Sequence, residues 1–226
     1  MKAKNNDNDK IFKDYIEQKK KLQESLLDYI DNDDPYDVNY KDLIRIIKNQ
    51  RILKNHNELE HFLCLLIHIS NNHHRNFLFF EKIERIIKEF SKKIKQRLSN
   101  QTIFHLFKSN KIILLFAIQE EIITLEEIII KEIVNFDKFK TPRYCHFFIP
   151  EIEKKSNDKT NKEIEEIKKH FKYDSEYYYQ KRFEGENDNY ISTLIRNDSI
   201  IEFIEYINKN HISPSSNIKT SIYETN

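Results

Sequence analysis

The sequence has almost no glycine, since Gly185 is the only one among 226 residues. Glycine supplies the positive-φ backbone that phosphate-binding loops and tight β-hairpins require. Its scarcity argues against Gly-rich phosphate loops, type I′ hairpins and open α/β sheets, and favours helices joined by Asn, Asp and Ser turns. We predict a structural role for Gly185, which is expected to end one helix with a positive φ.

Cysteine is also scarce, and the chain has only Cys64 and Cys145, which lie far apart among apolar neighbours. This pattern predicts buried free thiols in a reducing compartment. Neither sign of charge dominates, because 38 Lys and Arg residues against 37 Asp and Glu residues leave a net charge of +1. Such a balance gives no strong attraction to nucleic acid or to an anionic membrane, so neither is a predicted partner.

Long apolar runs are missing as well. The runs Ile112–Phe116 and Ile128–Ile130 are short and bracketed by charge, well below the roughly 18 apolar residues that a membrane helix requires. The N-terminal residues MKAKNNDNDKIFKDY contain no apolar segment of the kind found in secretory signals. We therefore predict a cytoplasmic protein that does not span a membrane.

Apolar residues recur at helical spacing along most of the chain, and short polar turns separate the segments. The longest predicted helix covers 77–98. A later one covers 125–134, with Thr124 as its N-cap and Glu127 completing a capping box. Short helices with turns of a few residues predict an all-α fold of antiparallel helix hairpins, stacked into a solenoid-like array.

Changes in polarity along the chain predict its domain organisation. The four predicted regions are a disordered N-terminus at 1–9, a helical domain at 10–150, a polar loop or linker at 151–163 and a C-terminal helical segment at 164–226. Within the second region, the prolines Pro142 and Pro150 frame a stretch that is expected to be less regular than its neighbours.

The densest group of potential metal ligands is His61, Cys64, His68, His73 and His74. Spacings of three and four residues let the first three share a helix face, which permits zinc ligation. A second Cys/His pair at ligand spacing is missing, however, and the last two histidines lie across a turn. We favour a buried thiol beside histidines that bond the last helix carbonyls, and we predict no metal and no cofactor.

A second candidate for chemistry is the pair Cys145 and His146. A cysteine nucleophile needs a histidine within hydrogen-bond reach and a third, orienting group. Sequence neighbours usually point apart, and no glycine lies nearby to form an oxyanion turn. We therefore predict no catalytic residue and a chain that is not an enzyme.

The aromatic run Tyr177, Tyr178 and Tyr179, followed by Arg182, is the candidate interface. Such side chains are favoured at protein interfaces, and they can also stack on bases. The alternative is that the rings pack against neighbouring helices. Because the net charge is close to zero, a protein interface is favoured over a nucleic-acid one.

Several blocks of the sequence carry a family resemblance. They are LIHISNNHHRNFLFFEKIERII at 66–87, IFHLFKSNKIILLFAIQEEIIT at 103–124, FFIPEI at 147–152 and the C-terminal EGENDNYISTLIRNDSIIEFIEYINKN with SIYETN. These blocks resemble the helical domain of unknown function that precedes ankyrin repeats in proteins of parasitic protists. The resemblance implies an all-helical region that leads into ankyrin repeats, with degenerate ankyrin-like character at its C-terminal end. The chain ends at Asn226, about where such an array begins, and the resemblance carries over no catalytic residue.

Together these observations predict a non-enzymatic protein–protein interaction or scaffold module of an ankyrin-repeat-type protein. Its predicted partner is another protein, and the C-terminal helical end is expected to support self-association because an uncapped solenoid end exposes apolar surface. One alternative is a truncated gene remnant or capping fragment without autonomous activity. Another is a zinc-binding or cysteine-dependent enzyme.

Overall fold

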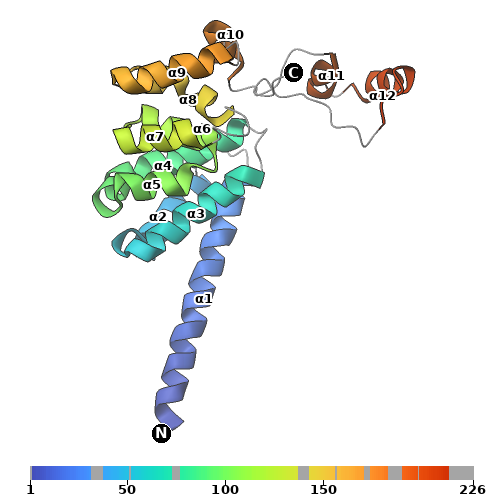
Figure 1. Cartoon of the computed structure of the whole chain (residues 1–226). Helices are drawn as coiled ribbons and strands as arrows, with labels where there is room; N and C mark the ends of the chain where they lie inside the picture. The colour runs from blue at the N-terminus through green and yellow to red at the C-terminus, as the bar shows by residue number, and fades with distance from the viewer. Residues whose placement is uncertain are drawn as a thin grey trace. The chain divides into compact units, whose positions relative to one another are not determined.

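The structure, a computed structural model, describes residues 2–31, 38–50, 52–72, 77–136, 143–155, 157–170, 174–182, 190–197 and 199–213. Within these ranges the chain forms twelve α-helices and one short 3-10 turn, and no strand (Figure 1). The predicted all-α class is therefore confirmed. The chain divides into two units, Met1–Thr124 and Leu125–Asn226.

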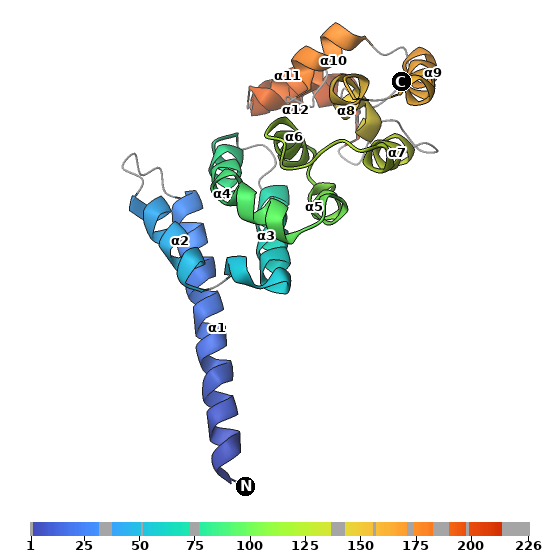
Figure 2. The same cartoon turned by 90° about the vertical axis from the view of Figure 1, so that its left-hand side faces the viewer.

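The first unit contains six helices and the 3-10 turn. They are α1 (Lys2–Asp31), α2 (Val38–Asn49), η1 (Ile52–Lys54), α3 (His56–Asn72), α4 (Phe77–Arg97), α5 (Asn100–Phe107) and α6 (Lys111–Gln119). The C-terminal half of α1 packs along α2, while its N-terminal half extends beyond α2 in both views (Figures 1 and 2). In the packed half of α1, Leu22, Leu26 and Ile30 contribute to the core.

The core of this unit follows the apolar stripes that the sequence shows. On α4, Ile83, Ile86 and Phe90 are buried. Removing each such side chain from water contributes about 1.5–3 kcal/mol. The observed helix Phe77–Arg97 agrees with the predicted range 77–98 to within one residue.

Asparagine side chains hold the turns between these helices. The side chain of Asn110 accepts a hydrogen bond from the Ile113 amide at 3.1 Å and so caps α6, while its Nδ2 donates to Oδ1 of Asn71 at 3.0 Å. The Asn100 side chain binds both backbone groups of Thr124. The predicted N-cap role of Thr124 is wrong, because the next helix begins at Glu127 and Glu126 occupies its N-cap position.

The second unit contains α7 (Glu127–Asn135), α8 (Arg143–Glu153), α9 (Asp158–His170), α10 (Ser175–Lys181), α11 (Tyr190–Arg196) and α12 (Ile200–Lys209). Helix α7 packs on α8, α8 contacts α10, and α11 pairs with α12. The segment framed by prolines is a helix with Pro150 inside it, not an irregular stretch. Its side chains from Tyr144 to Ile149 are all buried, and this burial outweighs the hydrogen bond that proline cannot donate.

Two polar segments of the sequence also form helices. Residues 2–9 continue α1, and residues 158–163 form the first half of α9. Helix α9 forms because Asn157 accepts a hydrogen bond from the Thr160 amide and Ile164 is fully buried, so the polar residues need only face solvent. The division between the two units falls after Thr124. Gly185, His73 and His74 lie outside the described residues.

Candidate interaction surfaces

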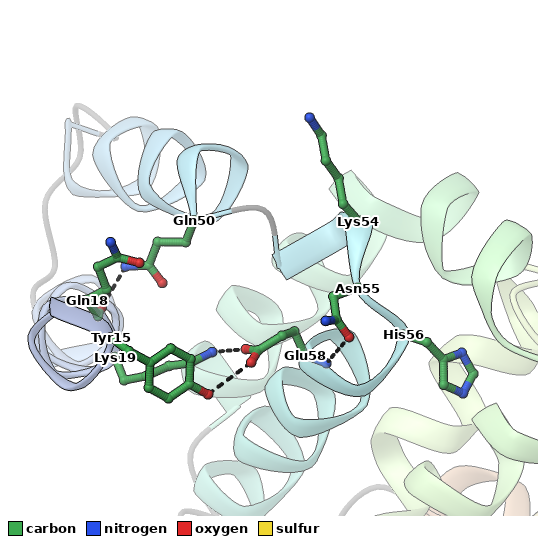
Figure 3. A pocket seen from close by; sticks show the side chains of 8 residues that line it. All are labelled: Tyr15, Gln18, Lys19, Gln50, Lys54, Asn55, His56 and Glu58. Atoms are coloured by element: carbon green, nitrogen blue, oxygen red, sulfur yellow. Dashed lines mark hydrogen bonds and ion pairs between the residues drawn. The ribbon is translucent and has the colours of Figure 1, made fainter. Parts of the chain in front are cut away.

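A polar pocket of about 460 Å³ lies where α1, the end of α2 and the start of α3 meet (Figure 3). Its lining residues are Tyr15, Gln18, Lys19, Gln50, Lys54, Asn55, His56 and Glu58. The lining combines hydroxyl, amide, imidazole and ammonium groups with a single carboxylate. Sequence reasoning missed this site, because its members come from three segments that only the tertiary structure brings together.

Glu58 is the centre of the pocket. Its Oε1 accepts a hydrogen bond from the Tyr15 hydroxyl at 2.9 Å, and its Oε2 pairs with Nζ of Lys19. Burial by itself raises the pKa of Glu58, but the hydrogen bonds from Lys19 and Tyr15 outweigh it and hold this pKa below its ordinary value. Glu58 thus fastens α1 to the first turn of α3.

The side-chain amides of Gln50 and Asn55 form hydrogen bonds to the backbone around the pocket. Gln50 donates from Nε2 to the Gln18 carbonyl at 2.6 Å, and Oε1 of Gln50 is buried with no hydrogen-bond partner in the described part of the chain. Asn55 caps α3 by accepting from the amides of Asn57 and Glu58. Figure 3 shows Lys54 directed away from the Glu58 cluster. Most polar groups here join helices, so the pocket is first of all a structural junction.

The residues at zinc-ligand spacing do share one face of α3, but that face is the solvent side. His61, Cys64 and His68 are all exposed. The prediction that Cys64 is buried is wrong, because the helix turns its neighbours Leu63 and Leu66 inward and leaves Cys64 outside. Among the described residues, no group of three or more His, Cys, Asp or Glu could hold a metal ion.

Cys145 and His146 are both 2% exposed on α8, which confirms that Cys145 is a buried thiol. Burial raises the pKa of Cys145 to about 12 and lowers the pKa of His146 to about 4. At neutral pH the thiol is therefore protonated and the imidazole is neutral. A cysteine nucleophile requires a depressed pKa, and this environment shifts the pKa the opposite way.

The four residues predicted to form an interface differ in their exposure to solvent. Tyr179 is 62% exposed, and Tyr177 is partly exposed. The Tyr178 ring stands edge-on to His146, with 5.5 Å between centroids. Arg182 is only 4% exposed: Nη1 donates to Oε1 of Glu151 at 3.1 Å and Nη2 pairs with Oε2.

This guanidinium also lies 4.9 Å from the centroid of the Phe147 ring. Arg182 therefore ties the end of α10 to α8. Of the predicted set, only the tyrosines reach the surface.

Helix α12 presents the most exposed apolar face in the described part of the second unit. Ile200 is 62% exposed, Ile201 71% and Ile204 48%. No residue of α12 is buried, although one side of the helix contacts α11. The sequence predicts an apolar helix in this segment. Which side of α12 stays exposed depends on the position of α11, and the sequence does not show that position.

Among the described helices, none combines the length and apolar character needed to cross a membrane. Comparison of the chain with protein-family models, with curated proteins and with solved structures finds no match.

Proposed function

We propose that this chain is a non-enzymatic protein–protein interaction module of scaffold type, with α12 as its docking element. The observation that carries the proposal is the apolar face of α12, where Ile200, Ile201 and Ile204 are each about half exposed or more. Isolated helices as short as α12 are marginal in water, and most helical stability comes from packing an amphipathic face. A partner that covers the isoleucines supplies that missing contact.

The proposed architecture is a short solenoid of stacked helix hairpins. Within the first unit, α1 contacts α2, α3 contacts both α4 and α5, and α4 and α5 both contact α6. Contacts between elements close in sequence are what a solenoid requires. The resemblance to the helical domain that precedes ankyrin repeats fits this arrangement, and we include membership of that group, degenerate ankyrin-like character at the C-terminal end and a cytoplasmic location in the proposal.

Affinity capture from the cells that express the protein tests the function. We expect the tagged full chain to recover a defined set of proteins, and Ile204→Glu to lower that recovery at least about fivefold, because a charge in the centre of an apolar contact removes its main contribution. The matched control is Ile128→Glu, which changes an isoleucine that is 50% exposed on α7. Recovery of nothing above background, or equal loss with both variants, would contradict the proposal.

A further inference from the structure

The last two turns of α4 carry positive charge only. No aspartate or glutamate occurs between Glu89 and Glu120, although the chain as a whole has 37 acidic residues. Within this stretch, the end of α4 presents four exposed cations, which are Lys92, Lys93, Lys95 and Arg97. In this article they are called the cationic end of α4.

Helix geometry places these four side chains around the whole solvent side of the helix end. Each residue advances about 100° around a helix, so the four span about 200°, from Lys95 round to Arg97. Gln96, which is exposed and neutral, lies in the middle of this arc. The buried residues Ile94 and Leu98 lie in the remaining arc. No carboxylate therefore interrupts the cationic surface along these two turns.

The carboxylates that precede and follow this stretch do not neutralise it. Glu89 and Glu120 each pair with another lysine, at 3.0 and 2.8 Å. Lys93 donates a hydrogen bond to Oε1 of Gln96 at 3.4 Å. Within the ranges that the structure describes, none of the four cations forms an ion pair, and Glu121 pairs with none of them.

The start of α3 extends the positive surface. Nδ1 of His56 lies 3.1 Å from the carbonyl oxygen of Arg97, so the two helix ends are in contact. Lys54, two residues earlier, is exposed and forms no ion pair with a described residue. The carboxylates of the first turns of α3 have other partners, because Glu58 pairs with a lysine of α1 and Glu60 lies 3.2 Å from Nε2 of His56.

This surface suits an acidic protein segment better than a nucleic acid. Proteins that bind single strands stack the bases on exposed aromatic rings. No aromatic residue occurs from Ser91 to Thr102, and Phe90 is buried. A rigid helix would meet only one side of α4, whereas the cations span about 200°. A flexible segment can follow that curved surface.

We infer that the cationic end of α4 binds a flexible segment of a partner protein that is rich in Asp and Glu. The carboxylates of the segment supply the ion pairs that the four cations do not form within the described chain. A single exposed ion pair contributes little, so the affinity depends on several carboxylates acting together and on low salt. The inference goes beyond the proposed function, since it concerns a helix of the first unit and does not require α12.

Two labelled peptides test the inference by fluorescence anisotropy with the purified full chain. One is a flexible peptide of Glu, Gly and Ser, and the other has Gln in place of each Glu. We expect the acidic peptide to bind at least about tenfold more tightly at low salt. The difference should vanish at about 1 M salt, where the screening length falls to about 3 Å. Equal binding of the two peptides at low salt overturns the inference.

Charge reversal locates the binding surface. The double variant Lys93→Glu with Arg97→Glu changes exposed residues without an ion pair, and we expect it to bind the acidic peptide about tenfold more weakly. The matched control is Lys154→Glu with Lys155→Glu, which changes two exposed lysines of the second unit and alters the net charge by the same amount. An equal loss in both double variants would assign the binding to net charge and contradict the inference.

A milder variant keeps the test valid if the reversal unfolds α4, which circular dichroism shows. Lys92→Gln with Lys95→Gln retains good helix formers and removes two charges, and it should weaken binding about threefold. Unchanged binding in this variant counts against the inference.

Two further outcomes would overturn the inference and leave the proposed function intact. A labelled single-stranded oligonucleotide that binds more tightly than the acidic peptide, and less tightly to the Lys93 and Arg97 variant, would identify a nucleic-acid surface. If the acidic peptide does not bind and the double variant only lowers the melting temperature, the cations serve to complement the C-terminal end of the helix dipole. Affinity capture with Ile204→Glu reports on α12 and is independent of both results.

Discussion

At the scale of single residues, two ionisable side chains near the core have opposite electrostatic surroundings. Arg182 is buried against a carboxylate that neutralises it. Glu84, on α4, is partly buried near Glu81 and Glu120, two groups of its own sign. Glu151 compensates the charge of Arg182, whereas burial, Glu81 and Glu120 disfavour the charged form of Glu84, so the two residues make opposite predictions.

The pH dependence of stability follows from Glu84. Burial first, and then Glu81 and Glu120, raise the pKa of Glu84 from 4.5 to about 7. Because this pKa is higher in the folded state, the fold binds more protons than the unfolded chain between those values, and stability falls as pH rises from 4.5 through 7. We expect Glu84→Gln to be more stable than the natural protein by about 1–2 kcal/mol at pH 8, less than the full shift implies because the carboxyl retains some contact with solvent.

Urea unfolding at pH 5 and pH 8 measures this effect. The gain should shrink at pH 5, where the natural carboxyl is largely protonated in the fold. Glu24→Gln is the control, since Glu24 is exposed on α1 beside Lys20. An equal gain at both pH values would show that the side-chain amide stabilises by packing and not by removing charge.

The pair Arg182–Glu151 predicts a large loss of stability. Removing one partner of a buried ion pair leaves the other charge uncompensated, so Arg182→Ala should cost about 3–5 kcal/mol in unfolding free energy. Lys131 provides the control, because its pair with Glu127 is exposed, and its change to alanine should cost less than about 1 kcal/mol. Similar costs for the two variants would mean that Arg182 is solvated and not buried.

At the scale of elements, asparagine side chains cap the start of several helices in this glycine-poor chain. Asn110 caps α6, Asn55 caps α3 and Asn157 caps α9. Their side-chain oxygens satisfy amides that a helix start leaves without partners. A chain with one glycine can form many turns in this way.

The Asn100 side chain makes two hydrogen bonds to the backbone of Thr124, and their loss is predicted to weaken the first unit. Its Oδ1 accepts from the Thr124 amide at 2.9 Å and its Nδ2 donates to the Thr124 carbonyl at 2.7 Å. Asn100→Ala removes both bonds and should cost about 1–3 kcal/mol. Thermal unfolding measures the loss, with exposed Gln119→Ala at the end of α6 as the control. A change no larger than that of the control would mean that water replaces the side chain.

At the scale of the whole molecule, each of the two units buries apolar residues of its own. The buried residues Ile86 and Phe104 belong to the first, and Phe148 and Ile164 to the second. Regions with separate cores open with separate free energies, which amide hydrogen exchange resolves.

This separation predicts local effects of mutation. In Arg182→Ala we expect faster amide exchange in α8 and α10, while α3 and α4 keep the protection of the natural protein, because α3 and α4 belong to the other unit. Hydrogen exchange with mass spectrometry on the full chain gives both values in one experiment. A uniform loss of protection along the chain would mean that the two units unfold as one.

The sequence by itself determined the class of fold and the positions of the helices with the clearest apolar periodicity. The apolar stripe of α4 and the Asn110 turn before α6 could be predicted, because helical periodicity and capping depend on residues a few positions apart. The tertiary structure decided which side chains are covered. Cys64 is exposed, Arg182 is buried and one edge of α12 stays open. Burial depends on helices distant in sequence, and periodicity cannot show which helix covers which face.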